Sequence, residues 1–202
     1  MNSKKSLIAI TMGDPCGVGP EIIVAALTDP AIHSVCSPLV LGDQRAMQRA
    51  LTVCNSPLEL VTVSSPAEAA NLPDSVIPLL ELSSLADIDI AYGKPSELAG
   101  DAVYRYIRRA AELCLTGEVA AMATAPICKE AMHRAGHHYP GHTELLAELC
   151  RCDQFVMMLA GDVLRVALVT IHEAIANVPG LISTEQVLKT IRVTANGVAP
   201  LC

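Results

Sequence analysis

The chain has 202 residues, of which 51% are hydrophobic and only 17% are charged. This length supports one hydrophobic core with room for a second small lobe, and this composition excludes a disordered chain. The net charge of −7 gives no general attraction to nucleic acid or anionic lipid, and 2% aromatic residues supply few rings for stacking on bases. A phosphate-bearing ligand must therefore be bound at a local site.

The first part of the chain alternates predicted strands with predicted helices. An apolar run that ends at Met12-Gly-Asp-Pro15 predicts a buried strand followed by a turn. Gly19-Pro20 then opens a predicted helix, because proline is favoured in the first helical turn. The predicted strands are residues 7–11, 39–41, 58–63 and 76–80, the last weakened by Pro73 and Pro78, and the predicted helices are residues 21–27 and 44–51.

The pattern continues after residue 100. Residues 101–115 give the clearest predicted helix, because apolar residues recur on one face and Gly117 follows its end. Further strands are predicted at 119–123, 154–159 and 164–170, and further helices at 129–135, at 142–150 and after Ser183, which forms a capping box with Gln186. Asn196-Gly197 is expected to end that last helix. The alternation predicts an α/β fold with a mostly parallel sheet flanked by helices.

Neither a membrane span nor a cysteine-bound zinc site is predicted. The apolar run of residues 155–171 contains Asp162 and Arg165 and falls short of a span, and the apolar part of the N-terminus is too short for a signal peptide. The eight cysteines are scattered and include no C-x-x-C pair. We expect a cytoplasmic protein with reduced thiols and no membrane or nucleic-acid partner.

The segment Gly13-Asp14-Pro-Cys-Gly-Val-Gly-Pro-Glu21 is the first candidate site. Its glycines allow close approach of a ligand, and the helix that follows offers free N–H groups to an anion. It is not a dinucleotide fingerprint, because Ile22 stands where that pattern has Gly or Ala, and it is not a P-loop. A tight turn that needs Gly and Pro for its backbone explains the same residues, so both interpretations stay open.

Lys129 is the second candidate. It follows Thr124-Ala-Pro126 after a predicted strand of small residues, and ligands of open α/β sheets bind beyond the carboxyl ends of strands. Lys129 is therefore placed to meet a phosphate or a carboxylate. The alternative is a solvated lysine in the first turn of a helix.

The densest polar cluster is His137-His-Tyr-Pro-Gly-His142-Thr143-Glu144. His142 and Thr143 at a predicted helix start combine an imidazole, a hydroxyl and free N–H groups, which suits a bound phosphate or carboxylate. Metal binding by His137 and His138 is less favoured, because side chains of successive residues diverge. The alternative is a Gly/Pro loop with surface histidines in which Thr143 or Glu144 only caps the helix.

His172 is the candidate metal ligand. We expect it at the carboxyl end of a predicted aliphatic strand, at the ligand-binding edge of the sheet. One histidine supplies one ligand, whereas a metal site needs about three. A histidine that merely caps a strand is the alternative.

Five segments together resemble the 4-hydroxythreonine-4-phosphate dehydrogenase family, from about residue 6 to about residue 192. They are Ile10-Thr-Met-Gly-Asp-Pro-Cys-Gly-Val-Gly-Pro-Glu21, Gly93-Lys94-x-Ser96, Thr124-Ala-Pro-Ile-Cys-Lys-Glu130, Gly141-His-Thr-Glu144 and Leu164-Arg-Val-Ala-Leu-Val-Thr-Ile-His172. The segment around His137–Glu144 is also similar to the branch that acts on D-threonate and D-erythronate 4-phosphate.

The resemblance implies a fold of the isocitrate/isopropylmalate dehydrogenase type. It also implies NAD- or NADP-linked oxidation and decarboxylation of 4-phosphooxy-L-threonine, with a divalent metal (Zn, Mg, Co or Mn) as Lewis acid. By resemblance His142 and Thr143 are the substrate-binding pair, His172 is one metal ligand, and Lys129 and Asp14 line the same cleft. A homodimer is implied in the same way.

The resemblance also implies a longer protein. Residues 1–192 are expected to be the N-terminal portion of the dehydrogenase, and residues 193–202 form a tail that no longer resembles the family. The chain alone is expected to be weakly active or inactive. The alternative is a remnant that only binds phosphate or pairs with a paralogous subunit.

Overall fold

The computed structural model describes residues 5–199, in two compact units that divide between Cys150 and Arg151. The strands of the first unit are β1 (Ser6–Thr11), β2 (Cys36–Asp43), β3 (Glu59–Thr62), β4 (Val76–Ser83) and β5 (Ala121–Thr124). They form one sheet in the order β3-β4-β2-β1-β5, and every pair in it is parallel. The mostly parallel α/β fold expected from the sequence is confirmed.

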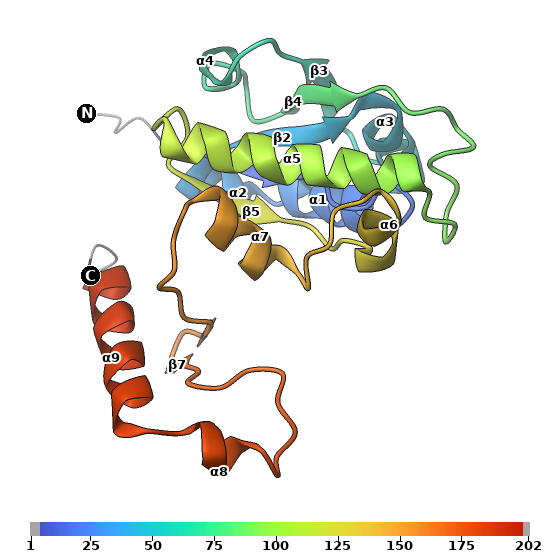
Figure 1. Ribbon diagram of the computed structural model, residues 1–202. Coiled ribbons are helices and arrows are strands. Elements are labelled where there is room, and N and C mark those ends of the chain that lie inside the picture. Colours follow the sequence, from blue (N-terminus) through green and yellow to red (C-terminus); the bar gives the residue numbers. More distant parts are fainter. Residues whose placement is uncertain (1–4, 200–202) are drawn as a thin grey trace. The chain divides into compact units, whose positions relative to one another are not determined.

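Helices cover both faces of this sheet. They are α1 (Gly19–Thr28), α2 (Pro30–Val35), α3 (Gln44–Val53), α4 (Pro66–Ala69), α5 (Glu97–Leu115), α6 (Lys129–Arg134) and α7 (His142–Leu149). In Figure 1, α5 crosses the front face and carries α6 and α7 against it, whereas α1 and α3 lie behind the strands. The longer helices match their predictions within a few residues; α2 and α4, of one to two turns, were not predicted.

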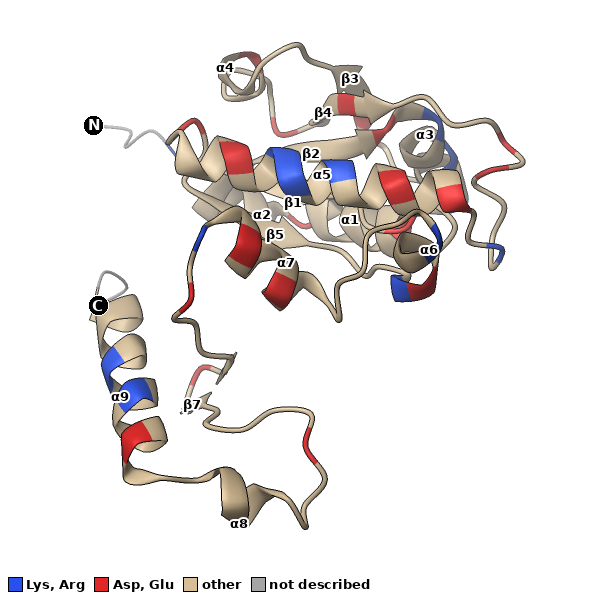
Figure 2. Cartoon of the chain, in the orientation of Figure 1, with Lys and Arg blue, Asp and Glu red and all other residues tan. Residues whose placement is uncertain are grey.

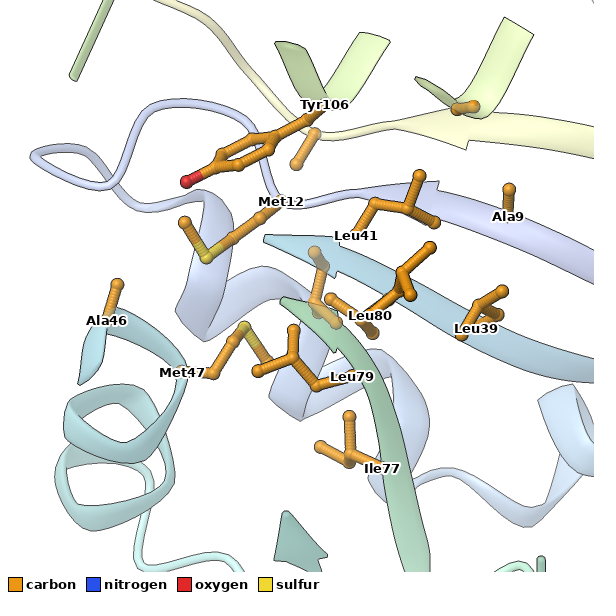
Figure 3. Close-up of a cluster of buried hydrophobic side chains, with 14 of the residues drawn as sticks. Ala9, Met12, Leu39, Leu41, Ala46, Met47, Ile77, Leu79, Leu80 and Tyr106 are labelled. Carbon is orange, nitrogen blue, oxygen red and sulfur yellow. The ribbon is translucent and has the colours of Figure 1, made fainter. Parts of the chain in front are cut away.

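Aliphatic side chains fill the space between the helices and the sheet. Figure 3 shows Leu39, Leu41 and Leu79 from two neighbouring strands, with Met47 of α3 on one side of them and Tyr106 of α5 on the other. All five side chains are completely buried. Because the chain contains only 2% aromatic residues, Tyr106 is the exception in this core.

A buried carboxylate ties β2 to β4 and to the start of α3. Oδ1 of Asp43 accepts the backbone N–H groups of Arg45 and Ala46 at 3.0 and 3.1 Å, which caps the helix. Oδ2 accepts the Ser83 hydroxyl and the Leu85 N–H group, both at 2.9 Å. A buried charge is tolerated when it is fully hydrogen-bonded, so Asp43 has a structural role.

The second unit contains a hairpin of β6 (Met158–Ala160) and β7 (Arg165–Ala167), followed by α8 (Val178–Leu181) and α9 (Thr184–Val198). The strands predicted at 154–159 and 164–170 are present but shorter than predicted. Each strand has three residues, and the two pair antiparallel in a sheet of their own. The physical reason is the short connection, since parallel strands need a crossover of about a dozen residues.

The predicted start of α9 is confirmed, but its predicted end was wrong. The Ser183 hydroxyl oxygen accepts the Gln186 N–H group at 3.1 Å. The helix then continues through Asn196-Gly197 to Val198, because Gly197 keeps a negative φ and does not turn the chain. Of the tail expected at 193–202, residues 200–202 lie outside the described residues. None of the helices within residues 5–199 is both long and apolar enough to cross a membrane.

Close packing of α5 against α6 requires glycine at position 100. A Cβ atom placed on Gly100 would overlap the carbonyl group of Ala131. We expect Gly100→Ala to lower the free energy of unfolding by about 2 kcal/mol, because backbone must move to make room. Urea denaturation measures this. Leu98→Ala, which trims an exposed side chain of the same helix, should change little, and equal stability of the two variants would contradict the packing argument.

Candidate functional site

The candidate site lies where β1 and β5 end side by side. The chain leaves β1 toward α1 behind the sheet and leaves β5 toward α6 on the front face (Figure 1). Connections that diverge to opposite faces open a crevice at the carboxyl ends of neighbouring strands, which is where open α/β sheets bind ligands. Both the Gly13–Glu21 segment and the turn that precedes Lys129 start from this edge.

The two connections touch through their backbones. The N–H group of Asp14 donates to the Pro126 carbonyl at 2.9 Å. A Cβ atom on Gly13, whose φ is +73°, would overlap that carbonyl, and one on Gly19 would overlap the Met12 carbonyl. These glycines are therefore required by backbone geometry, which is the structural alternative that the sequence left open.

The Asp14 carboxylate makes a hydrogen bond within its own loop. It is 7% exposed, and its Oδ1 accepts the Cys16 N–H group at 2.8 Å. This bond fixes the turn between β1 and α1. The carboxylate thus shapes the loop.

Arg49 of α3 anchors the same loop from behind. Its guanidinium donates to the Pro15 carbonyl at 2.7 Å and to the Ile90 carbonyl, and it lies 3.9 Å from the centre of the Tyr92 ring. The Tyr92 hydroxyl in turn donates to Glu21 of α1. One cation therefore joins the loop after β1 to the connection between β4 and α5.

A cavity of about 490 Å³ opens elsewhere, at the carboxyl ends of β2 and β4, and is lined by Asp43, Arg45, Arg49 and Glu81 among others. Arg45 pairs with Asp87 at 3.4 Å, and Arg49 holds two carbonyls. Both arginines of this cavity therefore already have partners within the fold, so we do not place the candidate site in it.

Lys129 and His142 meet at the candidate site. Lys129 is the first residue of α6 and His142 is the first residue of α7. A Cβ atom on Gly141 would lie 3.9 Å from the Lys129 ammonium nitrogen, so the cation reaches the start of α7. Gly141 supplies no side-chain cap to this helix. The first N–H groups of α7 thus lack a side-chain acceptor and lie beside a positive charge.

The His142 imidazole has an unpaired polar atom. Its Nε2 is buried and has no hydrogen-bond partner. Burial, and then the positive charge of Lys129, lower the pKa of His142 below its usual value of 6.5. The ring is therefore neutral at neutral pH and can donate one N–H group to an anionic oxygen without a proton transfer.

His172 lies in the second unit, and the expectation that a strand of the main sheet delivers it was wrong. β7 ends at Ala167, and His172 follows in irregular backbone with φ of +57° and is exposed. Within residues 5–199 no three His, Cys, Asp or Glu side chains gather in a way that could hold a metal ion. The described residues therefore do not make up a site for the divalent metal that the resemblance implies.

Several contributing residues were missed in the sequence. Arg49 gave no local signal, because the carbonyls that it holds lie 34 and 41 residues away. Asp101 and Tyr104 of α5 were interpreted only as part of an amphipathic helix. Both contact His137, which lies just before the site.

The fold and the polar groups at one edge of its sheet define the class: a parallel α/β protein with a candidate anion site at the carboxyl ends of its strands. The family described as pyridoxal phosphate biosynthetic protein PdxA matches residues 34–200. The chain belongs to this family.

Individual proteins that are similar to this chain are named as dehydrogenases. The chain is 90% identical over its 202 residues to 4-hydroxythreonine-4-phosphate dehydrogenase of Trichlorobacter lovleyi, of which it covers 60%. It is 41% identical to D-threonate 4-phosphate dehydrogenase of Cupriavidus necator over 187 residues, 90% of this chain and 56% of that one. The solved structure of a 4-hydroxythreonine-4-phosphate dehydrogenase from Burkholderia phymatum matches with a TM-score of 0.86 at 39% identity, covering 94% of this chain and 57% of that one. The chain thus spans about 60% of the length of these relatives.

The lowered pKa of His142 predicts a pH dependence of stability. Between its lowered pKa and 6.5 the unfolded chain binds a proton that the folded chain does not. The free energy of unfolding should therefore fall as the pH is lowered through this window, and this fall should be smaller in His142→Gln. Urea denaturation at about pH 7.5 and about pH 5 checks this. His138→Gln, at an exposed histidine, serves as control; the same pH dependence in wild type and His142→Gln would contradict the assignment.

Proposed function

We propose that this chain forms the phosphate-binding part of a 4-hydroxythreonine-4-phosphate dehydrogenase. Such an enzyme oxidises the secondary alcohol of 4-phosphooxy-L-threonine, and the resulting β-keto acid loses CO₂ to give 3-amino-2-oxopropyl phosphate, a precursor of pyridoxal phosphate. The proposal is supported by membership of the PdxA family and by the name of the 90% identical relative.

The observation that carries the proposal is the unpaired Nε2 of His142 beside Lys129. Buried polar atoms nearly always have a partner, and leaving one unpaired costs about 1–3 kcal/mol. A negatively charged oxygen would pair with this atom and with the Lys129 ammonium group at the same place. A phosphate-bearing substrate supplies such an oxygen.

Each residue then has a separate role. Lys129 supplies the positive charge, and neutral His142 donates a directional hydrogen bond. The Thr143 hydroxyl and the first N–H groups of α7 add further donors, in the way that helix N-termini hold phosphate. We call Lys129, His142, Thr143 and these N–H groups the phosphate cradle. Asp14 keeps the neighbouring loop in place and lines the same cleft.

The redox chemistry of such an enzyme uses a nicotinamide cofactor and a divalent metal. NAD or NADP would accept the hydride, and we assign no residue to that cofactor. His172 is proposed as one ligand of the divalent metal (Zn, Mg, Co or Mn), but the described residues do not complete a ligand set. One ligand does not hold a catalytic metal tightly, so we propose that the chain alone is weakly active or inactive.

A second candidate function is the dehydrogenation of D-threonate or D-erythronate 4-phosphate. The relative from Cupriavidus necator and the segment His137–Glu144 favour it. Both substrate classes carry a terminal phosphate, and the same cradle would bind it. The third candidate is a remnant that binds phosphate or pairs with a paralogous subunit without turnover.

Phosphate binding tests the proposal. We expect inorganic phosphate and 4-phosphooxy-L-threonine to bind the chain, and Lys129→Ala to weaken both about tenfold, because a charged hydrogen bond is worth about 1.5–3 kcal/mol. Isothermal titration calorimetry measures the affinities, with D-threonate 4-phosphate as the competing substrate. Lys189→Ala, which removes the same charge from α9, is the matched control. Unchanged binding by Lys129→Ala would overturn the proposed cradle.

We also propose a homodimer of a cytoplasmic enzyme. The cysteines of residues 5–199 that the structure describes are free thiols, which supports a reducing location. None of residues 151–199 is buried, and Leu159, Val163 and Ile175 are among their exposed apolar side chains. A unit of this size gains little stability without burying such surface. A second copy of the chain is the proposed partner.

Sedimentation equilibrium tests this association. We expect the chain to dimerise, and we expect the double variant Val163→Ser and Ile175→Ser to shift the equilibrium toward monomer, because it removes apolar area from the proposed interface. Ile88→Ser, which changes an exposed residue of the first unit, is the control. A wild-type chain that stays monomeric at all concentrations would refute the homodimer.

A further inference from the structure

The connection between α6 and α7, residues 135–141, leads directly to His142. Side-chain contacts hold it to α5 and to α7. His137 Nε2 lies 3.0 Å from Asp101 Oδ1 on α5. The His137 ring stacks on the Tyr104 ring, with centroids 3.8 Å apart and planes 10° from parallel. The His137 N–H group donates to the Met132 carbonyl at 2.9 Å. One loop residue is thus fixed to α5 through its side chain and to α6 through its backbone.

Tyr139 fixes the same connection two residues later. Its hydroxyl donates to Glu148 of α7 at 3.0 Å, and its carbonyl lies 2.9 Å from His133 Nε2 of α6. Its ring lies nearly parallel to that of Tyr104, with centroids 6.4 Å apart. His137 and Tyr139 therefore share one aromatic support, Tyr104 of α5.

We propose that His137, hydrogen-bonded to Asp101 and stacked on Tyr104, is a positioning residue that sets the place of His142 and Thr143 in the phosphate cradle. This inference deepens the proposed function and rests on it. It also gives His137 a role other than metal binding. His138 does not share that role, because it is exposed and its ring lies 5.6 Å from that of His133.

The clamp, which we define as His137 and Tyr139 with their partners Asp101 and Tyr104 on α5, is joined to the phosphate cradle by a short link. Only Pro140 and Gly141 separate Tyr139 from His142. Proline fixes its own φ, and Gly141 is fully extended, with φ of −178°. A displacement of His137 or Tyr139 would therefore be passed to the first turn of α7 and would change how deeply His142 is buried.

Asp101 uses a different oxygen for each of its two partners. Oδ1 meets His137, and Oδ2 lies 3.0 Å from Nε of Arg105, one helical turn further along α5. Along α5 two acidic residues are followed by three basic residues and then by one acidic residue, and Figure 2 shows these groups of charge one after another on the helix. The ion pair with Arg105 is exposed and can be removed separately. Arg105→Ala is therefore a matched control for Asp101→Ala, because both lose the ion pair and only Asp101→Ala loses the bond to His137.

The experiment combines phosphate affinity with the titration of His142. Inorganic phosphate is titrated into the 202-residue chain by calorimetry, and ¹⁵N-histidine spectra follow His142 as the pH changes. The charged groups near the start of α7 are Lys129 and Glu144. We expect Asp101→Ala to weaken phosphate binding about tenfold. We also expect the His142 midpoint to rise toward 6.5, because a displaced ring is better hydrated.

Further variants separate positioning from general damage. Arg105→Ala should leave both readouts at the wild-type values. Asp101→Asn keeps an oxygen that can accept a hydrogen bond from His137, so it should restore most of the affinity lost in Asp101→Ala. His137→Ala should behave as Asp101→Ala does, and the double variant should lose no more than either single variant, because both remove one contact.

Wild-type phosphate affinity and an unshifted His142 midpoint in Asp101→Ala and His137→Ala would overturn the inference. Equal losses in Arg105→Ala and Asp101→Ala would overturn it too, since the ion pair alone would then explain the effect. If the wild-type chain itself fails to bind phosphate, the proposed function fails. The His142 midpoint in the same variants then still decides whether the clamp exists.

Discussion

The backbone approach between the loop after β1 and the turn after β5 is the constraint on which the site depends. Asp14 donates its N–H group to the Pro126 carbonyl, and no side chain fits between the two segments at Gly13. This contact holds together the ends of two strands that are about 110 residues apart in the chain but adjacent in the sheet. This contact fixes the loop after β1 relative to the turn that leads into α6.

Residues outside the crevice then keep its parts in place. Arg49 fastens the loop after β1 to the β4–α5 connection, and Asp43 ties the ends of β2 and β4 to α3. On the other face α5 supports α6 through the glycine at position 100 and holds the α6–α7 connection through Asp101 and Tyr104. Contacts on both faces of the sheet thus hold the segments that surround the site. Within it, His142 Nε2 has no hydrogen-bond partner and the Lys129 ammonium group lies near the start of α7.

The two units differ in how they are stabilised. The first unit has a continuous aliphatic core, in which Leu39, Leu41 and Leu79 are completely buried. The second unit, over residues 151–199, has no buried residue. Its regular structure there is a hairpin of two three-residue strands and two helices. Its apolar side chains therefore stay largely exposed, among them Leu159, Val163 and Ile175.

The sequence by itself determined the order of most strands and helices in the first unit, the cap at Ser183, the helix start at Gly19-Pro20, and Lys129, His142 and Thr143 as candidates. These features depend on local periodicity, capping and turn chemistry, and each of these is set by residues that are close together in the sequence. It made the strands on either side of Gly161-Asp162 too long, ended α9 too early at Asn196-Gly197, and placed His172 at the edge of the main sheet. Only the tertiary structure decided that Lys129 faces the start of α7, that His142 Nε2 is buried without a partner, and that Arg49 and Asp101 support the site. These are contacts between residues 13 to 41 positions apart, and no local pattern encodes a contact that exists only after the sheet has brought distant segments together.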